Sequence, residues 1–200
     1  MKTLLSSPMF LLAATATTQD ADGAIFDVAA ALINEHGDLL ATWHTLTLPP
    51  VWNPMDVRTQ AAMTRSGVAA RAIIDSPPPG HVKMALAGWM NWIGGGIGNI
   101  NAAPPMASWT PGAAALFLRA GMNMSGLVDY SRVCADYARS LGHIPADGTA
   151  WTLPAACNRY GIPHFLPGRA IGDVLTAWLV VRSLALTGRQ AGTEPLGILA

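Results

Sequence analysis

Charged residues are scarce in this sequence, and they carry no net charge. Lysine, arginine, aspartate and glutamate make up 12% of its 200 residues, about half of their usual share in soluble proteins. The formal net charge is zero, so the chain lacks the basic excess with which duplex-binding proteins displace counterions. Hydrophobic residues make up 51% of the chain. This composition favours burial in a larger assembly, and we expect protein partners.

Cysteine is also scarce. Cys134 and Cys157 are the two cysteines of the chain, and they have neither zinc-site spacing nor the pattern of a disulfide framework. We interpret both as core residues, which favours a reducing, cytoplasmic setting.

Long uninterrupted apolar runs are missing beyond the N-terminal region. Glycine, proline or charge interrupts each later run, and we therefore predict no membrane span. Residues 1–16 resemble a secretory signal that ends in an Ala-Thr-Ala cleavage site, which leaves open a secreted domain cleaved near Ala16. We favour a first strand over residues 9–16, because the following segments complete a sheet pattern.

Three strand-like segments open the chain. They cover residues 9–16, 24–34 and 39–48, and the turn signal His36-Gly37-Asp38 separates the last two. Short connections between strands predict an antiparallel meander. Pro49-Pro50 ends it, because proline removes a ladder donor.

Helical periodicity follows the meander. Asp56 can cap a helix that runs to Arg65, and apolar residues between 82 and 93 repeat at helical spacing. We predict a loop at residues 94–105, a short strand at 106–109, and helices over 111–122, 129–141, 151–160 and 170–186, the last stopped by Gly188. Strands followed by alternating helices and short strands predict one α/β domain over residues 1–188, with a loosely ordered tail at 189–200.

Residues 151–184 carry the most specific pattern in the chain. Cys157 precedes Tyr160-Gly161-Ile162, and the segment Arg169-Ala170-Ile171-Gly172-Asp173 precedes Thr176-Ala177. This frame resembles the last motif of the DnaQ-like (DEDD-type) 3′–5′ exonucleases. The resemblance places Asp173 at the family's last metal-binding aspartate, and it places Gly168 at the family's catalytic histidine.

The other two motifs of that family resemble segments in which the acids are missing. Residues 14–19 read Ala-Thr-Ala-Thr-Thr-Gln, where the family has Asp-x-Glu-Thr-Thr-Gly, so the acids fall on Ala14 and Ala16. Phe117-Leu118 match the end of the middle motif, whose aspartate falls on Ala114. The resemblance covers roughly residues 9–186. It implies a ribonuclease H-like α/β fold, with a mixed central sheet opened by a three-stranded antiparallel meander and flanked by helices.

The resemblance also implies a chemistry that this chain has lost. Two-metal hydrolysis of a phosphodiester needs several carboxylates to hold the ions, and a histidine serves as the general base. With alanine or glycine at Ala14, Ala16, Ala114 and Gly168, Asp173 is the only retained ligand. We therefore expect no intact catalytic site, no bound metal and no cofactor. Natural degeneration and engineered inactivation both fit, and we favour degeneration because Gln19 and Gly168 go beyond what inactivation needs.

The leading hypothesis is a catalytically inactive exonuclease-like protein, acting as a structural or nucleic-acid-guiding subunit of a larger nucleoprotein assembly. Its residual groove would hold a single strand through side chains that contact phosphates or stack on bases. The candidates are Arg58, Arg65, Arg169 and Trp52.

The alternative is an active 3′–5′ exonuclease with a rebuilt site that binds Mg²⁺ or Mn²⁺. Its residues would be Asp173, Asp20 or Asp22, Asp27 and His164. Structural roles compete with each assignment. Asp173 can offset a helix dipole, Asp20 and Asp22 suit a turn, and His164 suits an exposed loop.

Overall fold

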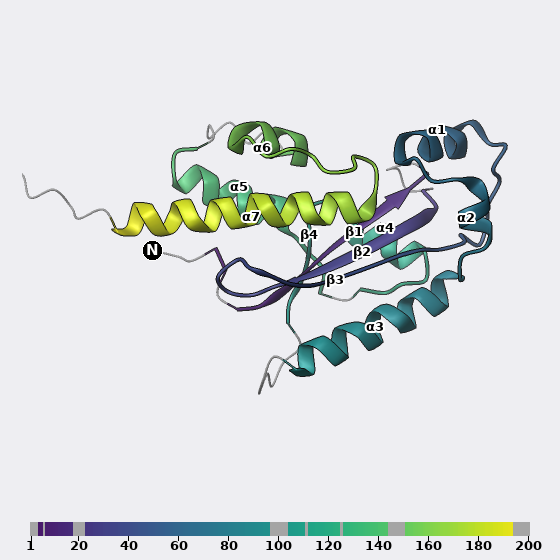
Figure 1. Cartoon of the computed structure of the whole chain (residues 1–200), viewed down its shortest axis with the longest axis horizontal. Helices are drawn as coiled ribbons and strands as arrows, with labels where there is room; N and C mark the ends of the chain where they lie inside the picture. Colours follow the sequence, from purple (N-terminus) through teal and green to yellow (C-terminus); the bar gives the residue numbers. More distant parts are fainter. Residues whose placement is uncertain are drawn as a thin grey trace, which may run out of the picture.

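A five-stranded mixed sheet forms the centre of the fold (Figure 1), in the order β3-β2-β1-β4-β5. The computed structural model describes residues 4–5, 7–17, 23–96, 104–110, 112–124, 126–143 and 151–193. The strands are β1 (Met9–Ala16), β2 (Ile25–Ile33), β3 (Leu39–Leu46), β4 (Met106–Ser108) and β5 (Val128–Asp129). Neighbours within β1–β3 are antiparallel, whereas β4 is parallel to both β1 and β5. The predicted meander is therefore confirmed.

Strand β1 joins the two halves of the sheet. It pairs with β2 on one side and with β4 on the other, and cleavage near Ala16 would remove it. Strand β2 is buried along its whole length. Because layers cover both of its faces, it reads as a continuous apolar run rather than an alternating one, interrupted only by Asp27.

Helices from different parts of the chain cover the two faces of the sheet (Figure 1). Helices α5, α6 and α7 pack with β1 and β2 in one apolar cluster. Helices α3 and α4 pack on the other face, and α1 and α2 enclose a small third cluster around Phe26. Their bounds are α1 (Val57–Ser66), α2 (Ala70–Ile74), α3 (Pro79–Gly96), α4 (Ala113–Arg119), α5 (Tyr130–Ser140), α6 (Leu153–Tyr160) and α7 (Ala170–Thr193).

Side-chain caps fix the starts of helices α1 and α5. The side chain of Asp56 accepts a hydrogen bond from the N–H of Thr59 at the start of α1, as predicted. Asp129 caps α5 in the same way, through the N–H of Ser131. Both capping residues satisfy donors that have no partner within the helix.

Two predicted helix ends at glycine are misplaced. Helix α3 continues through the glycine run at residues 94–96, and α7 passes Gly188 and ends at Thr193. The prediction of a helix stop at Gly188 is wrong, because this glycine serves packing. A Cβ atom at Gly188 would lie 1.8 Å from the hydroxyl oxygen of Tyr137 on α5. The predicted tail is therefore helical as far as residue 193, and residues 194–200 lie outside the described residues.

Helix α7 bears on the prediction that the chain has no membrane span. Residues Ala170–Gln190 are long and apolar enough to cross a membrane by length and composition alone. Half of an apolar 18-residue stretch within it is buried in the fold, where α7 packs against β1 and β2. Its apolar character therefore has a structural explanation as the core helix of the sheet.

Candidate functional site

A pocket of about 490 Å³ lies beside the first turns of α7. Its walls come from β1, from the segment after β4, from α1, α5 and α6, and from the loop that leads into α7. The lining is mostly apolar, and its polar members include Thr110, Ser131 and Thr152. The ionisable side chains that line it are Arg65, His164 and Asp173.

The structure brings His164 and Asp173 together in this pocket. His164 Nε2 lies 2.8 Å from Asp173 Oδ1, and both side chains are about a quarter exposed. Burial raises the pKa of Asp173, and the hydrogen bond with His164 offsets that rise only in part. His164 does lie in the loop before α7, as one interpretation expected, and this loop pairs it with Asp173. Its proximity to Asp173 needed a loop conformation that the sequence did not reveal.

The loop between α6 and α7 is what carries His164 into the pocket. Thr176 is buried, and its hydroxyl oxygen accepts a hydrogen bond from the N–H of Phe165 at 3.0 Å. The same hydroxyl donates to the carbonyl oxygen of Gly172 at 2.7 Å. Gly172 lets the loop approach closely, because a Cβ atom there would lie 2.1 Å from the carbonyl oxygen of Phe165.

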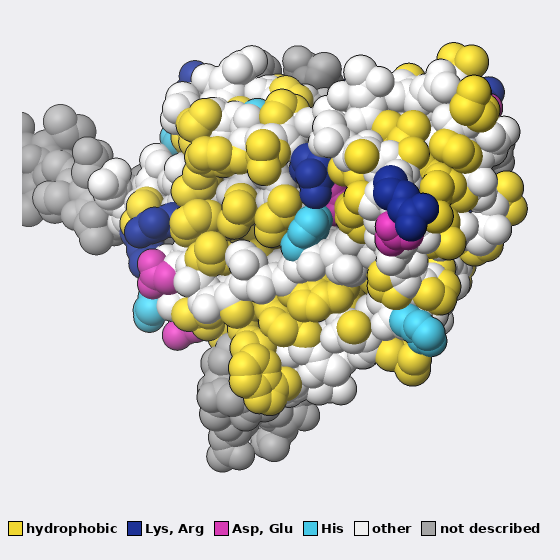
Figure 2. Space-filling view, turned by 45° about the vertical axis from the view of Figure 1, so that its right-hand side comes forward, with side chains coloured by type: hydrophobic (Ala, Val, Ile, Leu, Met, Phe, Trp, Pro, Cys, Tyr) yellow, Lys and Arg dark blue, Asp and Glu magenta, His cyan; other side chains and the backbone are white. Residues whose placement is uncertain are grey.

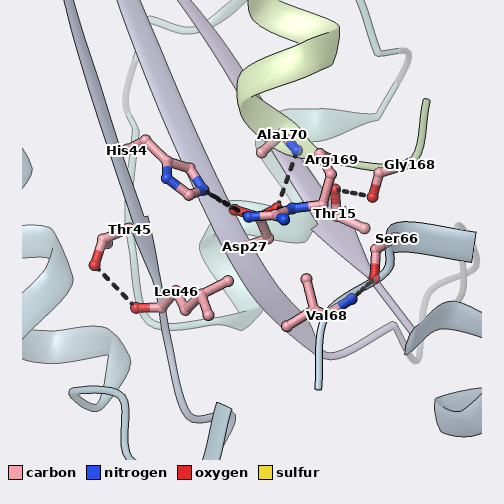
Figure 3. A network of polar contacts seen from close by, with 10 residues as sticks. All are labelled: Thr15, Asp27, His44, Thr45, Leu46, Ser66, Val68, Gly168, Arg169 and Ala170. Atoms are coloured by element: carbon pink, nitrogen blue, oxygen red, sulfur yellow. Dashed lines mark hydrogen bonds and ion pairs between the residues drawn. The ribbon is translucent and has the colours of Figure 1, made fainter. Parts of the chain in front are cut away.

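The predicted first-motif positions do not lie with Asp173. Ala14 and Ala16 pack against the cluster formed with α3 and α4, on the opposite face of the sheet. Near this end of β1, the residues on the α7 side are Ala13, which lines the pocket, and Thr15. Figure 3 shows Thr15, whose hydroxyl donates to the carbonyl oxygen of Gly168 at 3.1 Å.

The remaining two degenerate positions, Ala114 and Gly168, lie apart from each other. Ala114 is exposed on α4 and does not line the pocket. Gly168 does line it. Of the positions that the resemblance assigned, the structure therefore gathers only Gly168 and Asp173. Thr18, Gln19, Asp20 and Asp22 lie outside the described residues.

Asp27 is committed to a buried network at the start of α7 (Figure 3). Its side chain is fully buried. Oδ1 lies 2.6 Å from Nε2 of His44, whereas Oδ2 accepts from Nε of Arg169 at 2.8 Å and from the N–H of Ala170 at 3.2 Å. Burial alone raises the pKa of Asp27, but the hydrogen bonds from His44, Arg169 and Ala170 outweigh it and lower the pKa.

This network gives Asp27 and Arg169, two residues of the predicted binding sets, partners within the fold. Both oxygens of Asp27 already accept hydrogen bonds, and Asp27 does not line the pocket. Nε of Arg169 pairs with Asp27, and the Arg169 side chain is about a quarter exposed. The two residues tie β2 to the first residue of α7. The sequence signal for this structural role was the presence of one charged residue, Asp27, in the otherwise apolar β2.

The other predicted nucleic-acid contacts differ in position. Arg65 lines the pocket, whereas Arg58 is exposed on α1 outside it. Trp52 packs on Phe26 with ring centroids 6.0 Å apart, in the small third cluster. Its ring is therefore not offered for base stacking at the pocket.

The sequence analysis missed two pocket tryptophans. Trp109 and Trp151 line the wall, with ring centroids 5.7 Å apart. Nε1 of Trp109 donates to the carbonyl oxygen of Trp151 at 3.2 Å. The position of Trp109 directly after β4 was the available signal, because loops that follow parallel strands commonly form binding sites.

The residues that the structure describes do not fit a two-metal site. Among the described residues, no group of three or more histidine, cysteine, aspartate or glutamate side chains could hold a metal ion. Asp173 is the only carboxylate that lines the pocket in the described part of the chain. A single carboxylate already paired with a histidine cannot hold two ions in register.

Comparisons with known proteins identify the fold. No family model matches the chain, and no curated protein matches it in sequence. Solved structures do match. Cell-death related nuclease 4 (CRN-4) has a TM-score of 0.68 at 11% identity, over 91% of this chain and 64% of that chain. The chain has an exonuclease fold.

Two structures of exonuclease I give the same result. One has a TM-score of 0.65 at 13% identity, covering 91% of this chain and 41% of the exonuclease. The other, E. coli exonuclease I in complex with a dT13 oligonucleotide, has a TM-score of 0.65 at 10% identity and covers 94% and 43%. The predicted ribonuclease H-like α/β fold is confirmed. The chain spans less than two thirds of the length of each of these proteins.

Proposed function

We propose that this chain is a non-catalytic protein with an exonuclease fold, which binds single-stranded nucleic acid without a metal ion. The observation that carries the proposal is the charge of the pocket. Asp173 is paired with His164, and Arg65 lines the same pocket. Structures of exonuclease I with single-stranded DNA support the choice of ligand, because they share this fold.

Electrostatics explain why a strand would need no metal here. A cluster of carboxylates repels a phosphate group until cations neutralise it. In this pocket, the retained carboxylate already has a histidine partner, and an arginine is available to contact a phosphate directly. Figure 2 shows a face with only scattered charged side chains and no basic stripe. This fits a local contact better than an extended duplex-binding surface.

The first test uses labelled single-stranded DNA and RNA. We expect binding, measured by fluorescence anisotropy, to be the same in Mn²⁺ and in EDTA, and we expect the strands to remain intact after long incubation. Cleavage in Mn²⁺ that disappears in Asp173→Ala would instead establish the rebuilt exonuclease. The contact between His164 and Asp173 is the observation that favours this second candidate.

Arg65 and Arg58 provide matched variants for the same experiment, because both lie on α1 and only Arg65 lines the pocket. Arg65→Ala should weaken binding and reduce the salt dependence by about 0.7 in the slope of log K against log salt, the value for one phosphate contact on a single strand. Arg58→Ala should change neither quantity. Equal effects of both variants would contradict a specific role for the pocket.

We also propose that the chain works within a larger assembly. Large apolar side chains are exposed before and at the start of α1, where Val51 is 84%, Met55 77% and Val57 78% exposed. Such groups are usually covered by a partner. Protein purified from its native source should elute from a sizing column with other chains. Elution as a lone monomer would contradict this part of the proposal.

A further inference from the structure

Two exposed apolar side chains belong to the loop segment that supplies His164 and Gly168 to the pocket. Phe165 is 41% exposed and Leu166 is 62% exposed. We call residues 163–168 the apolar lip. His164 and Gly168, within the same segment, line the pocket. The lip is therefore continuous with the site described above.

The backbone of the lip is fixed from several sides. The N–H of Phe165 donates to the buried hydroxyl of Thr176, and the carbonyl oxygen of Leu166 accepts from the N–H of Arg169 at 3.0 Å. The carbonyl oxygen of Gly168 accepts from Thr15 on β1. Contacts with α7 and with the sheet thus hold the lip at both of its ends.

The lip also stores backbone strain. Leu166 has a φ of +39°, and among the described residues it is the only one other than glycine with a positive φ. That region costs roughly 1 kcal/mol or more for a residue with a Cβ atom. The strain does not bring the Leu166 side chain into the core, because this side chain remains largely exposed. Strain retained at an exposed apolar residue points to a binding role.

Arg65 lies on the same rim of the pocket as the lip. A Cβ atom at Gly168 would lie 3.1 Å from the carbonyl oxygen of Arg65, so the end of α1 and the lip are in direct contact. A cation on α1 and an aromatic ring on the lip that α1 contacts match the two parts of a nucleotide. The arginine meets the phosphate, and the ring meets the base.

We propose that Phe165, with Leu166 beside it, is the stacking platform for a base of the single strand whose phosphate contacts Arg65. The inference rests on the proposed function and assigns a residue to it. Stacking on an aromatic ring accepts every base, so the platform gives affinity without sequence preference. The fixed backbone limits the entropy lost when a base binds.

The test compares Phe165→Ala with Phe165→Tyr, using a fluorescently labelled oligo(dT) strand. Phe165→Ala should weaken binding by about 5- to 150-fold, the usual effect of losing one aromatic stack, and Phe165→Tyr should restore it. Trp92→Ala is the matched control, because Trp92 is 75% exposed on α3, which covers the opposite face of the sheet from the pocket. The control should bind as the unmodified chain does.

A series of strands with one abasic position locates the stacked base. At a single position, the abasic strand should lose affinity for the unmodified chain but not for Phe165→Ala. If Arg65→Ala weakens binding and Phe165→Ala does not, the stacking platform is overturned while the proposed function stands. If the unmodified chain binds no strand, both are overturned.

Discussion

Replacing Asp27 with alanine should lower the free energy of unfolding by about 3 kcal/mol, measured by urea denaturation at pH 7. The change leaves the N–H of Ala170 without its acceptor and removes the partner of Arg169. Losing one member of a buried pair costs about 3–5 kcal/mol. The lower end applies here, because Arg169 and His44 are each about a quarter to a third exposed and keep contact with water.

Asp75 provides the control for this substitution. Its ion pair with Arg71 has a similar distance of 2.7 Å, but both side chains are more than half exposed. Asp75→Ala should change the free energy of unfolding by no more than about 0.5 kcal/mol. Similar effects of the two substitutions would show that the Asp27 network does not hold α7 to the sheet.

The contribution of Asp27 to the free energy of unfolding should also depend on pH. The pKa of Asp27 is lowered in the folded state, so the folded protein holds this proton less tightly than the unfolded chain does. The contribution of Asp27 is therefore complete above about pH 4, the ordinary range of an aspartate. It is lost as the pH falls through the lowered value. Between pH 7 and pH 3, the unmodified chain should lose more stability than Asp27→Asn does.

Replacing Gly172 with alanine should destabilise the fold by about 1–3 kcal/mol, the usual range for overpacking a tight site. In an ordinary helix, the same change stabilises by about 1 kcal/mol. The sign reverses here because the added Cβ atom would lie 2.1 Å from the carbonyl oxygen of Phe165 and 2.6 Å from that of Leu166. Backbone atoms, already strained at Leu166, would have to move.

Gly88 on α3 is the matched glycine, because a Cβ atom there meets nothing within 4 Å. Gly88→Ala should raise the midpoint of thermal unfolding, and Gly172→Ala should lower it. A rise for both variants would mean that the loop does not rest on α7 as closely as the structure indicates.

The fold could largely be predicted from the sequence because local signals, such as turns and helix caps, set the ends of most of its elements. Strand β1 has the predicted bounds, and the cap at Asp56 starts α1 as expected. Glycine misled where its role is tertiary. Gly188 lies within α7 and makes room for Tyr137 of α5. This contact joins two helices that are distant in sequence.

The site was harder to predict, because it depends on the phase of a strand and on a loop. A displacement of one residue along a strand moves every side chain to the other face. Matching the Thr-Thr pair of the family motif selected Ala14 and Ala16, whereas Ala13 and Thr15 are the residues on the α7 side. His164 reaches Asp173 from a loop that includes a left-handed residue, Leu166, and no local pattern predicts that conformation.

The order in which the chain is synthesised gives the Asp27 network a further consequence. Arg169 and Ala170 follow Asp27 by 142 and 143 residues, so they leave the ribosome long after the meander. Until then, one oxygen of Asp27 has no donor, and closing the sheet around it is unfavourable. We therefore expect the strands of the meander to complete their packing only once α7 is available. Incomplete chains should then remain exposed to chaperones and proteases.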